Sequence, residues 1–197
     1  MKEILFVTTN KGKVESLQHS FDLLNADVVV TQTNLELAEE QADDALKVAQ
    51  AKAKLAFREL AKPLVVDDSA FHIPVLGGFP GVYQKYVIET IGPVGILKLL
   101  EGVQDRSAYF ISNLVYVDEE GKQYCFSDSH YNGTVAHEYN PDAAYKWGQI
   151  GKIFIPRGAT KVATELSADE RKKLAREEGF TDAYDEFAYW YTHQQTQ

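Results

Sequence analysis

The sequence predicts an α/β protein: an elongated mixed β-sheet flanked by helices, arranged in two lobes with a central active-site cleft. Strand-like and helix-like segments alternate up to Val66, which predicts parallel strands joined by right-handed crossovers. Further along, two strand-like segments flank a short turn, which predicts an antiparallel extension of the sheet. The hydrophobic content of 45% is enough for a substantial core. A cleft between two lobes is a common place for a ligand.

The first part of the chain contains three expected strands and two expected helices. A short apolar run opens it, and apolar residues at helical spacing follow the Asn10-Lys11-Gly12 stretch. The second helix is long and amphipathic, with its charged residues on one face. In chain order we expect a strand at Ile4–Thr8, a helix from Val14 to Leu24, a strand at Val28–Val30, a helix at Gln41–Ala61 and a strand at Leu64–Val66.

The second part mixes loops, short strands and helices. Breakers cluster in one loop, and a capping-box pattern precedes a late helix. We expect a loop at Leu76–Tyr83, a helix at Val94–Leu100, a hairpin of Ala108–Val117 and Gln123–Tyr131, strands at Thr134–Ala136 and Lys152–Ile155, a helix after Ser167, and an aromatic segment at Asp182–His193. Since there are no repeats or linkers, residues 1–197 should form a single α/β domain of two lobes.

Charge and cysteine content limit the partners. The formal charge is 20 − 29 = −9, which argues against general binding to a nucleic-acid backbone. The apolar run at the start of the chain is too short for a signal peptide or a membrane span. We therefore expect a cytoplasmic protein with no membrane or nucleic-acid partner. The single cysteine, Cys125, lies between two aromatic residues and is expected to be buried.

The segment between the first strand and the first helix suits a phosphate group. Hydroxyl, amide and ammonium groups gather there, and free N–H groups at a helix N-terminus attract anions. The segment consists of Thr8, Thr9, Asn10, Lys11, Gly12 and Lys13. It lacks the spacing of a Walker A loop, and a capped helix with exposed lysines is the open alternative.

Two adjacent acids and a hydroxyl, Asp67-Asp68-Ser69, follow the third expected strand. Ligands of open α/β sheets bind beyond the carboxyl ends of the strands. Adjacent carboxylates point in different directions, so one acid should hold a metal or water while its neighbour supports it. Mg²⁺ prefers oxygen ligands shared with substrate phosphates. Glu39 and Glu40 could supply another carboxylate, or could simply favour the following helix N-terminus.

Lysines could supply the counter-charge for a phosphate chain. Lys52 lies on the long helix, and Lys85 follows the loop rich in glycine and proline. Either lysine could equally be an ordinary solvated side chain. The aromatic stretch from Tyr184 to Tyr191 has two interpretations, packing against the sheet or a partner and stacking on a base, of which packing is favoured.

Together these segments resemble the inosine triphosphate pyrophosphatases, enzymes that act on non-standard purine nucleoside triphosphates. Thr8, Asn10 and Lys13 match the family's T-x-N-x-x-K pattern, with Thr9 in place of the usual glycine. The acidic pair with Ser69 and the stretch L-G-G-x-P-G-x-Y at Leu76–Tyr83 also match. Glu40 and Lys52 stand at the family's offsets, and the resemblance covers most of residues 3–135.

The resemblance implies a Mg²⁺-dependent homodimeric enzyme that releases pyrophosphate. The triphosphate would lie on residues 8–13, with help from Lys52 and Lys85. Glu40 and Asp68 would hold Mg²⁺, and Asp68 would also orient or deprotonate the water that attacks the α-phosphorus. Ser69 would steady the site through a hydrogen bond.

The C-terminal part departs from the family's pattern. The family reads G-F-G-[YW]-D-P-x-F and later S-H-R, both of which hold the purine. Trp147 and Gly148 keep an aromatic residue and a glycine, but Asp-Pro is missing, and Ala175-Arg176-Glu177 stands where S-H-R is expected. We therefore predict an altered base preference. Two other functions stay open: a non-catalytic nucleotide-binding or regulatory protein, and a phosphatase of another phosphorylated metabolite.

Overall fold

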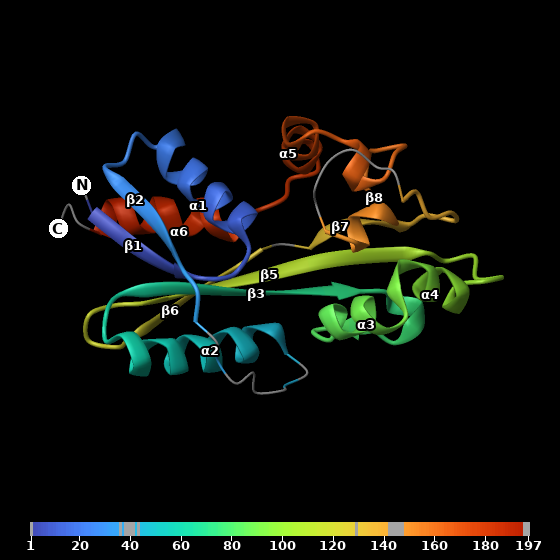
Figure 1. The fold of residues 1–197 in the computed structure, drawn as a ribbon. Helices are drawn as coiled ribbons and strands as arrows, with labels where there is room; N and C mark the ends of the chain where they lie inside the picture. The colour runs from blue at the N-terminus through green and yellow to red at the C-terminus, as the bar shows by residue number, and fades with distance from the viewer. Residues whose placement is uncertain are drawn as a thin grey trace. The chain divides into compact units, whose positions relative to one another are not determined.

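The computed structural model describes residues 2–35, 37, 42, 44–128, 130–141 and 148–194. Within these ranges lie one mixed β-sheet and the helices that flank it (Figure 1). The strands are β1 (Lys2–Val7), β2 (Val28–Thr33), β3 (Leu64–His72), β4 (Pro80–Gly81), β5 (Ser107–Val117), β6 (Gln123–Ser127), β7 (Tyr131–Val135) and β8 (Phe154–Pro156). The helices are α1 (Lys11–Leu23), α2 (Ala45–Leu60), α3 (Gln84–Thr90), α4 (Gly92–Leu99), α5 (Ala168–Glu177) and α6 (Ala183–His193), with short 3₁₀ turns at Pro74–Leu76, Ile150–Lys152 and Ala163–Glu165.

The sheet combines a parallel part and an antiparallel part, as the sequence predicts. Its strand order is β2-β1-β3-β5-β7-β8, with β4 paired to β3 and β6 paired to β5. β1 is parallel to both β2 and β3, whereas β5 is antiparallel to β6 and β7. The predicted α/β class with a mixed sheet and flanking helices is therefore confirmed.

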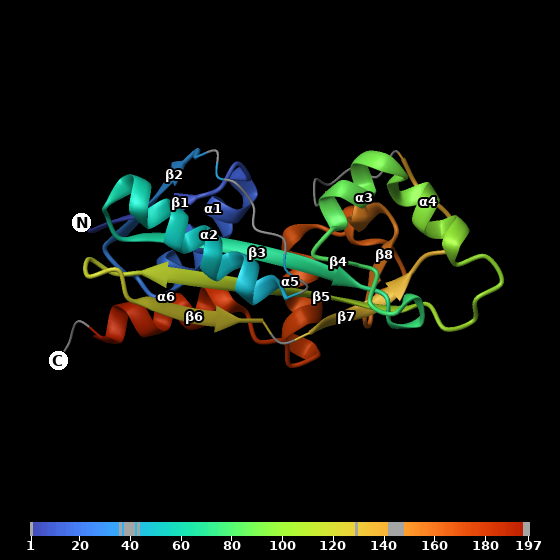
Figure 2. The same cartoon turned by 90° about the horizontal axis from the view of Figure 1, so that it is seen from below.

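The chain divides into two compact units, of which the first comprises Met1–Ser69, Ser112–Asp128 and Thr181–Gln197. Helices α1 and α6 lie side by side on one face of its sheet, and α2 lies on the other (Figures 1 and 2). Phe6 and Val65 pack with Phe187 of α6, while Val7 and Val66 pack with the alanines of α2. In both β1 and β3, neighbouring residues therefore pack into different cores on the two faces of the sheet, because strand side chains alternate between faces.

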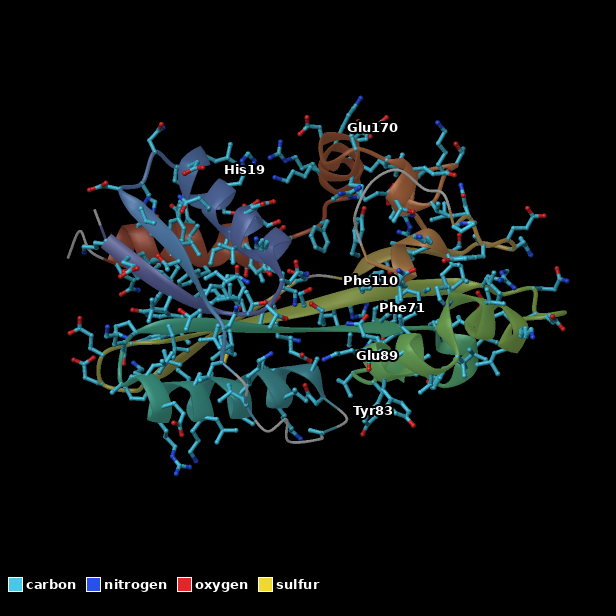
Figure 3. The ribbon with its side chains drawn as sticks, in the orientation of Figure 1. His19, Phe71, Tyr83, Glu89, Phe110 and Glu170 are labelled. Carbon is cyan, nitrogen blue, oxygen red and sulfur yellow. The ribbon has the colours of Figure 1, made fainter. Side chains whose placement is uncertain are left out.

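The second unit comprises Ala70–Ile111 and Ser129–Phe180. Its core contains tilted and edge-on aromatic rings, among them the tilted pair Phe71 and Phe110 with ring centroids 4.6 Å apart (Figure 3). Buried Arg106 donates hydrogen bonds to the carbonyl oxygens of Leu100, Val135 and Ala136 at 2.8, 2.9 and 2.6 Å. Those bonds satisfy a charged group that would otherwise be costly to bury. A single domain with two lobes and a central cleft stays a prediction.

Two predictions about the elements need correction, and one helix was not predicted. The second helix begins at Ala45, not at Gln41, because the Asp44 side chain accepts hydrogen bonds from the amides of Leu46 and Lys47 and caps it. The third strand continues to His72, so the acidic pair lies inside a strand and not at its end. Helix α3, seven residues long, was not predicted, since its apolar spacing is too short to indicate a helix.

The prediction that Cys125 is buried is wrong. Tyr124 and Phe126 pack against the core of the first unit, so Cys125 between them points to the opposite face of β6 and is exposed. Its Sγ accepts a hydrogen bond from Gln50 Nε2 at 3.4 Å. In the described ranges, no helix has the length and apolar character needed to cross a membrane.

Candidate active site

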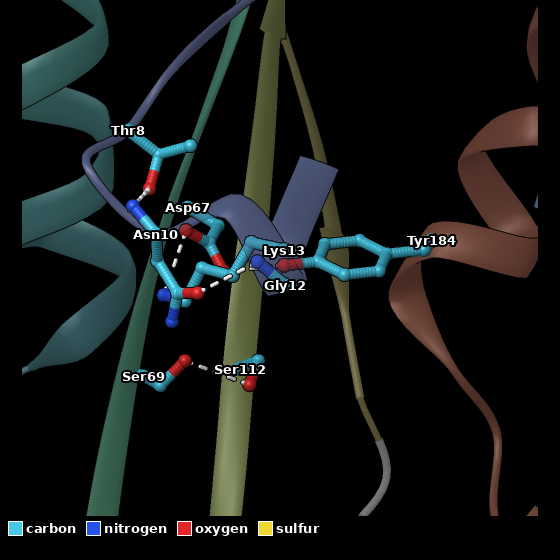
Figure 4. Close-up of polar contacts among 8 residues, drawn as sticks. All are labelled: Thr8, Asn10, Gly12, Lys13, Asp67, Ser69, Ser112 and Tyr184. Atoms are coloured by element: carbon cyan, nitrogen blue, oxygen red, sulfur yellow. Dashed lines mark hydrogen bonds and ion pairs between the residues drawn. The ribbon is translucent and has the colours of Figure 1, made fainter. Parts of the chain in front are cut away.

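The segment Thr8–Lys13 forms the loop between β1 and α1. Asn10 is the N-cap of α1, and its Oδ1 accepts a hydrogen bond from Gly12 N at 2.9 Å (Figure 4). Asn10 N donates to Thr8 Oγ1 at 3.1 Å, and Gln32 Nε2 donates to the Thr8 carbonyl at 2.9 Å. Thr9, Asn10, Lys11 and Gly12 are exposed. An ordered loop thus presents a helix N-terminus to solvent, an arrangement that suits an anion.

Asp67 connects this loop to the acidic strand. Its Oδ1 lies 2.8 Å from Lys13 Nζ, although the two residues are 54 positions apart in the chain. Its Oδ2 accepts a hydrogen bond from the Tyr184 hydroxyl of α6 at 2.7 Å (Figure 4). The side chain of Asp67 is only 2% exposed. The fold therefore brings together three segments that are distant in the sequence.

Asp68 points to the other face of β3. Val65 and Asp67 face α1 and α6, so by alternation Asp68 follows Val66 on the face that α2 covers. Asp68 is half-buried, and so is Lys52 of α2. The two adjacent acids therefore have different surroundings, as predicted from the directions of neighbouring side chains.

Ser69 belongs to a polar group on the Asp67 face. The hydroxyls of Ser69 and Ser112 lie 2.9 Å apart (Figure 4), and Asp128 N donates to the Ser112 carbonyl at 2.9 Å. The carboxylate of Asp128 accepts a hydrogen bond from Ala183 N at 2.8 Å. Burial raises the pKa of Asp128 to about 7, and the negative charge of Asp182 also raises it.

Asp128, Ser112 and the polar role of Tyr184 were not predicted from the sequence. Asp128 follows an edge strand and Ser112 lies inside a long strand, so neither belongs to a recognisable motif. The aromatic segment of Tyr184 packs against the core of the first unit, which confirms the packing interpretation. Tyr184 also carries a polar contact that only the three-dimensional structure reveals.

Other predicted site residues lie elsewhere or outside the described ranges. Lys85 is exposed on α3, and Gly148 is exposed with a φ of +78°; both belong to the second unit. Glu40 and Trp147 lie outside the described residues. The nucleotide contacts of all four stay predictions.

One of the two predicted Mg²⁺ ligands, Asp68, lies among the described residues. The half-buried carboxylate of Asp68 offers the hard oxygen ligand that Mg²⁺ prefers. Glu40, the second predicted ligand, is not among the described residues, and those residues contain no group of three or more His, Cys, Asp or Glu side chains placed to hold a metal. The carboxylate of Asp68 is of the kind that Mg²⁺ prefers, and the Mg²⁺ site itself stays a prediction.

Two pockets lie within the second unit. One, of about 500 Å³, has Tyr139, Lys161 and Glu165 among its lining residues. The other, of about 300 Å³, is lined in part by His130, Arg157, Leu174, Glu178 and Phe180. Leu174 and Glu178 flank Ala175-Arg176-Glu177 near the end of α5, where the S-H-R motif is missing. Neither pocket includes the Thr8–Lys13 loop.

Known proteins resemble this chain over nearly its full length. The model of the Ham1 family matches residues 4–180. A "dITP/XTP pyrophosphatase" of Methanopyrus kandleri is 34% identical over 96% of each chain, and one of Thermococcus kodakarensis is 36% identical over 95% of this chain and 96% of its own. A HAM1 protein structure from Coxiella burnetii covers 98% of this chain with a TM-score of 0.79 and 20% identity, which supports the fold alone.

Proposed function

Since the chain belongs to the Ham1 family, we propose that it is a nucleoside triphosphate pyrophosphatase. It converts nucleoside or deoxynucleoside triphosphates, such as those of inosine and xanthosine, to the monophosphate and pyrophosphate. The bond between Lys13 and Asp67 carries this proposal, because it joins the anion-binding loop to the acidic strand. The names of the similar archaeal proteins support the same reaction.

The phosphate chain binds the loop between β1 and α1. The positive end of the α1 helix dipole and the ammonium of Lys13 attract its negative charges. Lys52, half-buried on α2 of the same unit, adds positive charge, whereas a role for Lys85 of the second unit stays a prediction. These contacts hold the phosphates in place, and positioning supplies much of the catalysis in phosphoryl transfer.

Asp68 is the proposed catalytic residue. Its carboxylate orients a water molecule and takes a proton from it, and the oxygen of that water bonds to the α-phosphorus. The bond between the α-phosphorus and the bridging oxygen breaks, and the electron pair leaves with pyrophosphate. Asp68 and Glu40 would hold Mg²⁺, which when bound stabilises the negative charge on the phosphate oxygens.

The base preference is proposed to differ from that of the resembled enzymes. The chain contains no His-Arg pair, and α5 carries Ala175-Arg176-Glu177 in place of S-H-R. Sites that hydrogen-bond a substrate group discriminate strongly, so a change of donors changes which base is accepted.

Pyrophosphate release from a panel of nucleotides tests the activity. Inosine, xanthosine, guanosine, deoxyuridine and adenosine triphosphates are each incubated with Mg²⁺, and pyrophosphate and orthophosphate are measured separately. The wild type should release pyrophosphate, and Asp68→Asn should lose turnover by at least about a hundredfold while still binding nucleotide. The matched control Asp185→Asn changes an exposed carboxylate of α6 and should retain activity.

Each alternative function predicts a different result of this panel. A binding protein releases nothing from any nucleotide, and a phosphatase releases orthophosphate in place of pyrophosphate. A rate for inosine triphosphate far above all the others contradicts the altered base preference. Equal activity of Asp68→Asn and wild type contradicts the assignment of Asp68.

The homodimer predicted by the resemblance has a candidate surface on the second unit. Tyr83, Tyr86, Ile91 and Val94 are 40%, 68%, 47% and 46% exposed on or beside α3 and α4 (Figure 3 labels Tyr83). Clustered apolar side chains of this kind favour association. Sedimentation should give twice the 22.1 kDa chain mass, and Tyr86→Lys should give the monomer. The control Tyr189→Lys, on the first unit, should remain dimeric. A monomeric wild type contradicts the proposal.

The cytoplasmic location stays a prediction.

A further inference from the structure

A buried carboxylate joins the C-terminal helix α6 to the proposed phosphate loop. We propose that Tyr184 is a positioning residue of this site: through Asp67 it fixes the direction of the Lys13 ammonium group toward the phosphates of a bound nucleotide. The inference rests on the proposed function of the Thr8–Lys13 loop. It assigns a role in substrate binding to a helix that otherwise serves the core.

Each oxygen of Asp67 has its own donor. Oδ1 accepts from Lys13 Nζ at 2.8 Å, and Oδ2 accepts from the Tyr184 hydroxyl at 2.7 Å (Figure 4). Two donors on different oxygens allow the carboxylate only one orientation. The Asp67 side chain is 2% exposed, so little water is available to replace either donor.

Tyr184 is itself held firmly. Its ring packs edge-on against Phe6 with centroids 6.1 Å apart, and its backbone N–H donates to Asp182 Oδ1 at 2.8 Å at the start of α6. Burial, together with the nearby charge of Asp67, raises the pKa of the Tyr184 phenol well above its usual value. The hydroxyl therefore keeps its proton and acts as a donor to Asp67.

The contact with Asp67 restricts the rotamers of the Lys13 side chain. A lysine side chain has many rotamers, and fixing it costs entropy when a ligand binds. Lys13 is 28% exposed, and its ammonium has three N–H donors, of which one is used on Asp67. Among the described residues only Asp67 binds this ammonium, so its other donors can reach phosphate oxygens. A lysine that is oriented before the substrate arrives binds it with a smaller entropic cost.

A double-mutant cycle tests this role. Tyr184→Phe removes only the hydroxyl and keeps the ring that packs on Phe6. It should lower kcat/KM for pyrophosphate release about tenfold, mainly through KM, and weaken the affinity for inorganic tripolyphosphate with Mg²⁺ by a similar factor. In a Lys13→Met background the same change should have no further effect on either quantity, because the group that it positions is gone.

The control is Tyr189→Phe, which removes an exposed hydroxyl from the same helix and should change nothing. Thermal unfolding of every variant reports its stability separately. Equal factors for Tyr184→Phe in the wild-type and Lys13→Met backgrounds would show a merely structural role and overturn the proposal. So would unchanged tripolyphosphate affinity in Tyr184→Phe, or a wild type that binds no tripolyphosphate. A wild type that binds tripolyphosphate but hydrolyses no nucleotide contradicts the proposed function alone.

Discussion

At the scale of single residues, the alternation of β3 gives two adjacent acids unequal roles. Asp67 faces α1 and α6 and is enclosed by Lys13 and Tyr184, whereas Asp68 lies on the face of α2. A carboxylate with two protein donors is poorly placed to accept a proton from water. Asp67 therefore organises the residues around it, and Asp68, which matches the acid of the resembled family, is the proposed catalytic residue.

Asp128 should make stability depend on pH. Burial raises its pKa from 3.8 to about 7, so the folded protein favours the protonated acid. Below about pH 4 both the folded and the unfolded state are protonated. Between about pH 4 and pH 7 the unfolded state ionises while the folded state keeps the proton, so the free energy of unfolding falls as the pH rises. Asp128→Asn should therefore raise the free energy of unfolding by about 1–2 kcal/mol near pH 8, and by less near pH 5.

Urea unfolding at both pH values measures this difference. The amide oxygen of asparagine can still accept the hydrogen bond from Ala183 N, so the variant mainly removes the charge. Asp185→Asn, an exposed change on α6, serves as the control and should show no such trend. A stability difference for Asp128→Asn that is the same at both pH values would refute the assignment.

The sequence predicts the residues of the phosphate loop, but it does not predict the contacts that hold Lys13 of this loop in place. Thr8, Asn10 and Lys13 belong to a motif, and polar residues between a strand and a helix carry a physical meaning on their own. The contact of Tyr184 with Asp67 joins residues 117 positions apart, and no local pattern marks it. Contacts of this kind depend on which faces of two distant elements meet.

At the scale of elements, helix caps are predicted from local signals, but the full length of a strand is not. The capping box of Ser167 and Glu170 is confirmed at the start of α5, because both hydrogen bonds are local. The length of β3 was underestimated because charged residues usually end a buried strand. Here Lys13 and Tyr184 satisfy Asp67, so the strand continues.

Gly133 makes possible the close pairing of β7 with β8. A Cβ added there would lie 2.2 Å from the Ile155 carbonyl oxygen and 2.6 Å from the ring of Phe154. Backbone and a core ring have little freedom to move away, so Gly133→Ala should lower the free energy of unfolding by about 3 kcal/mol. Urea unfolding should show a much smaller change for Thr134→Ala, an exposed position on the same strand. Equal losses in the two variants would be inconsistent with this close approach.

At the scale of the whole molecule, the order of elements carries most of the predictable information. Alternating strands and helices gave the parallel part, and the Asp118–Gly121 turn gave the β5–β6 hairpin. The chain path in space shows which segments join each of the two units, and no sequence pattern indicates that grouping. The first unit alone brings together the phosphate loop, the acidic strand and α6.

The position of bond cleavage tests the central claim most directly. Nucleotide is hydrolysed with Mg²⁺ in water enriched in ¹⁸O, and the products are analysed by mass spectrometry. Attack of water on the α-phosphorus predicts one ¹⁸O atom in the nucleoside monophosphate and none in pyrophosphate. Label in pyrophosphate or orthophosphate would contradict the proposed reaction.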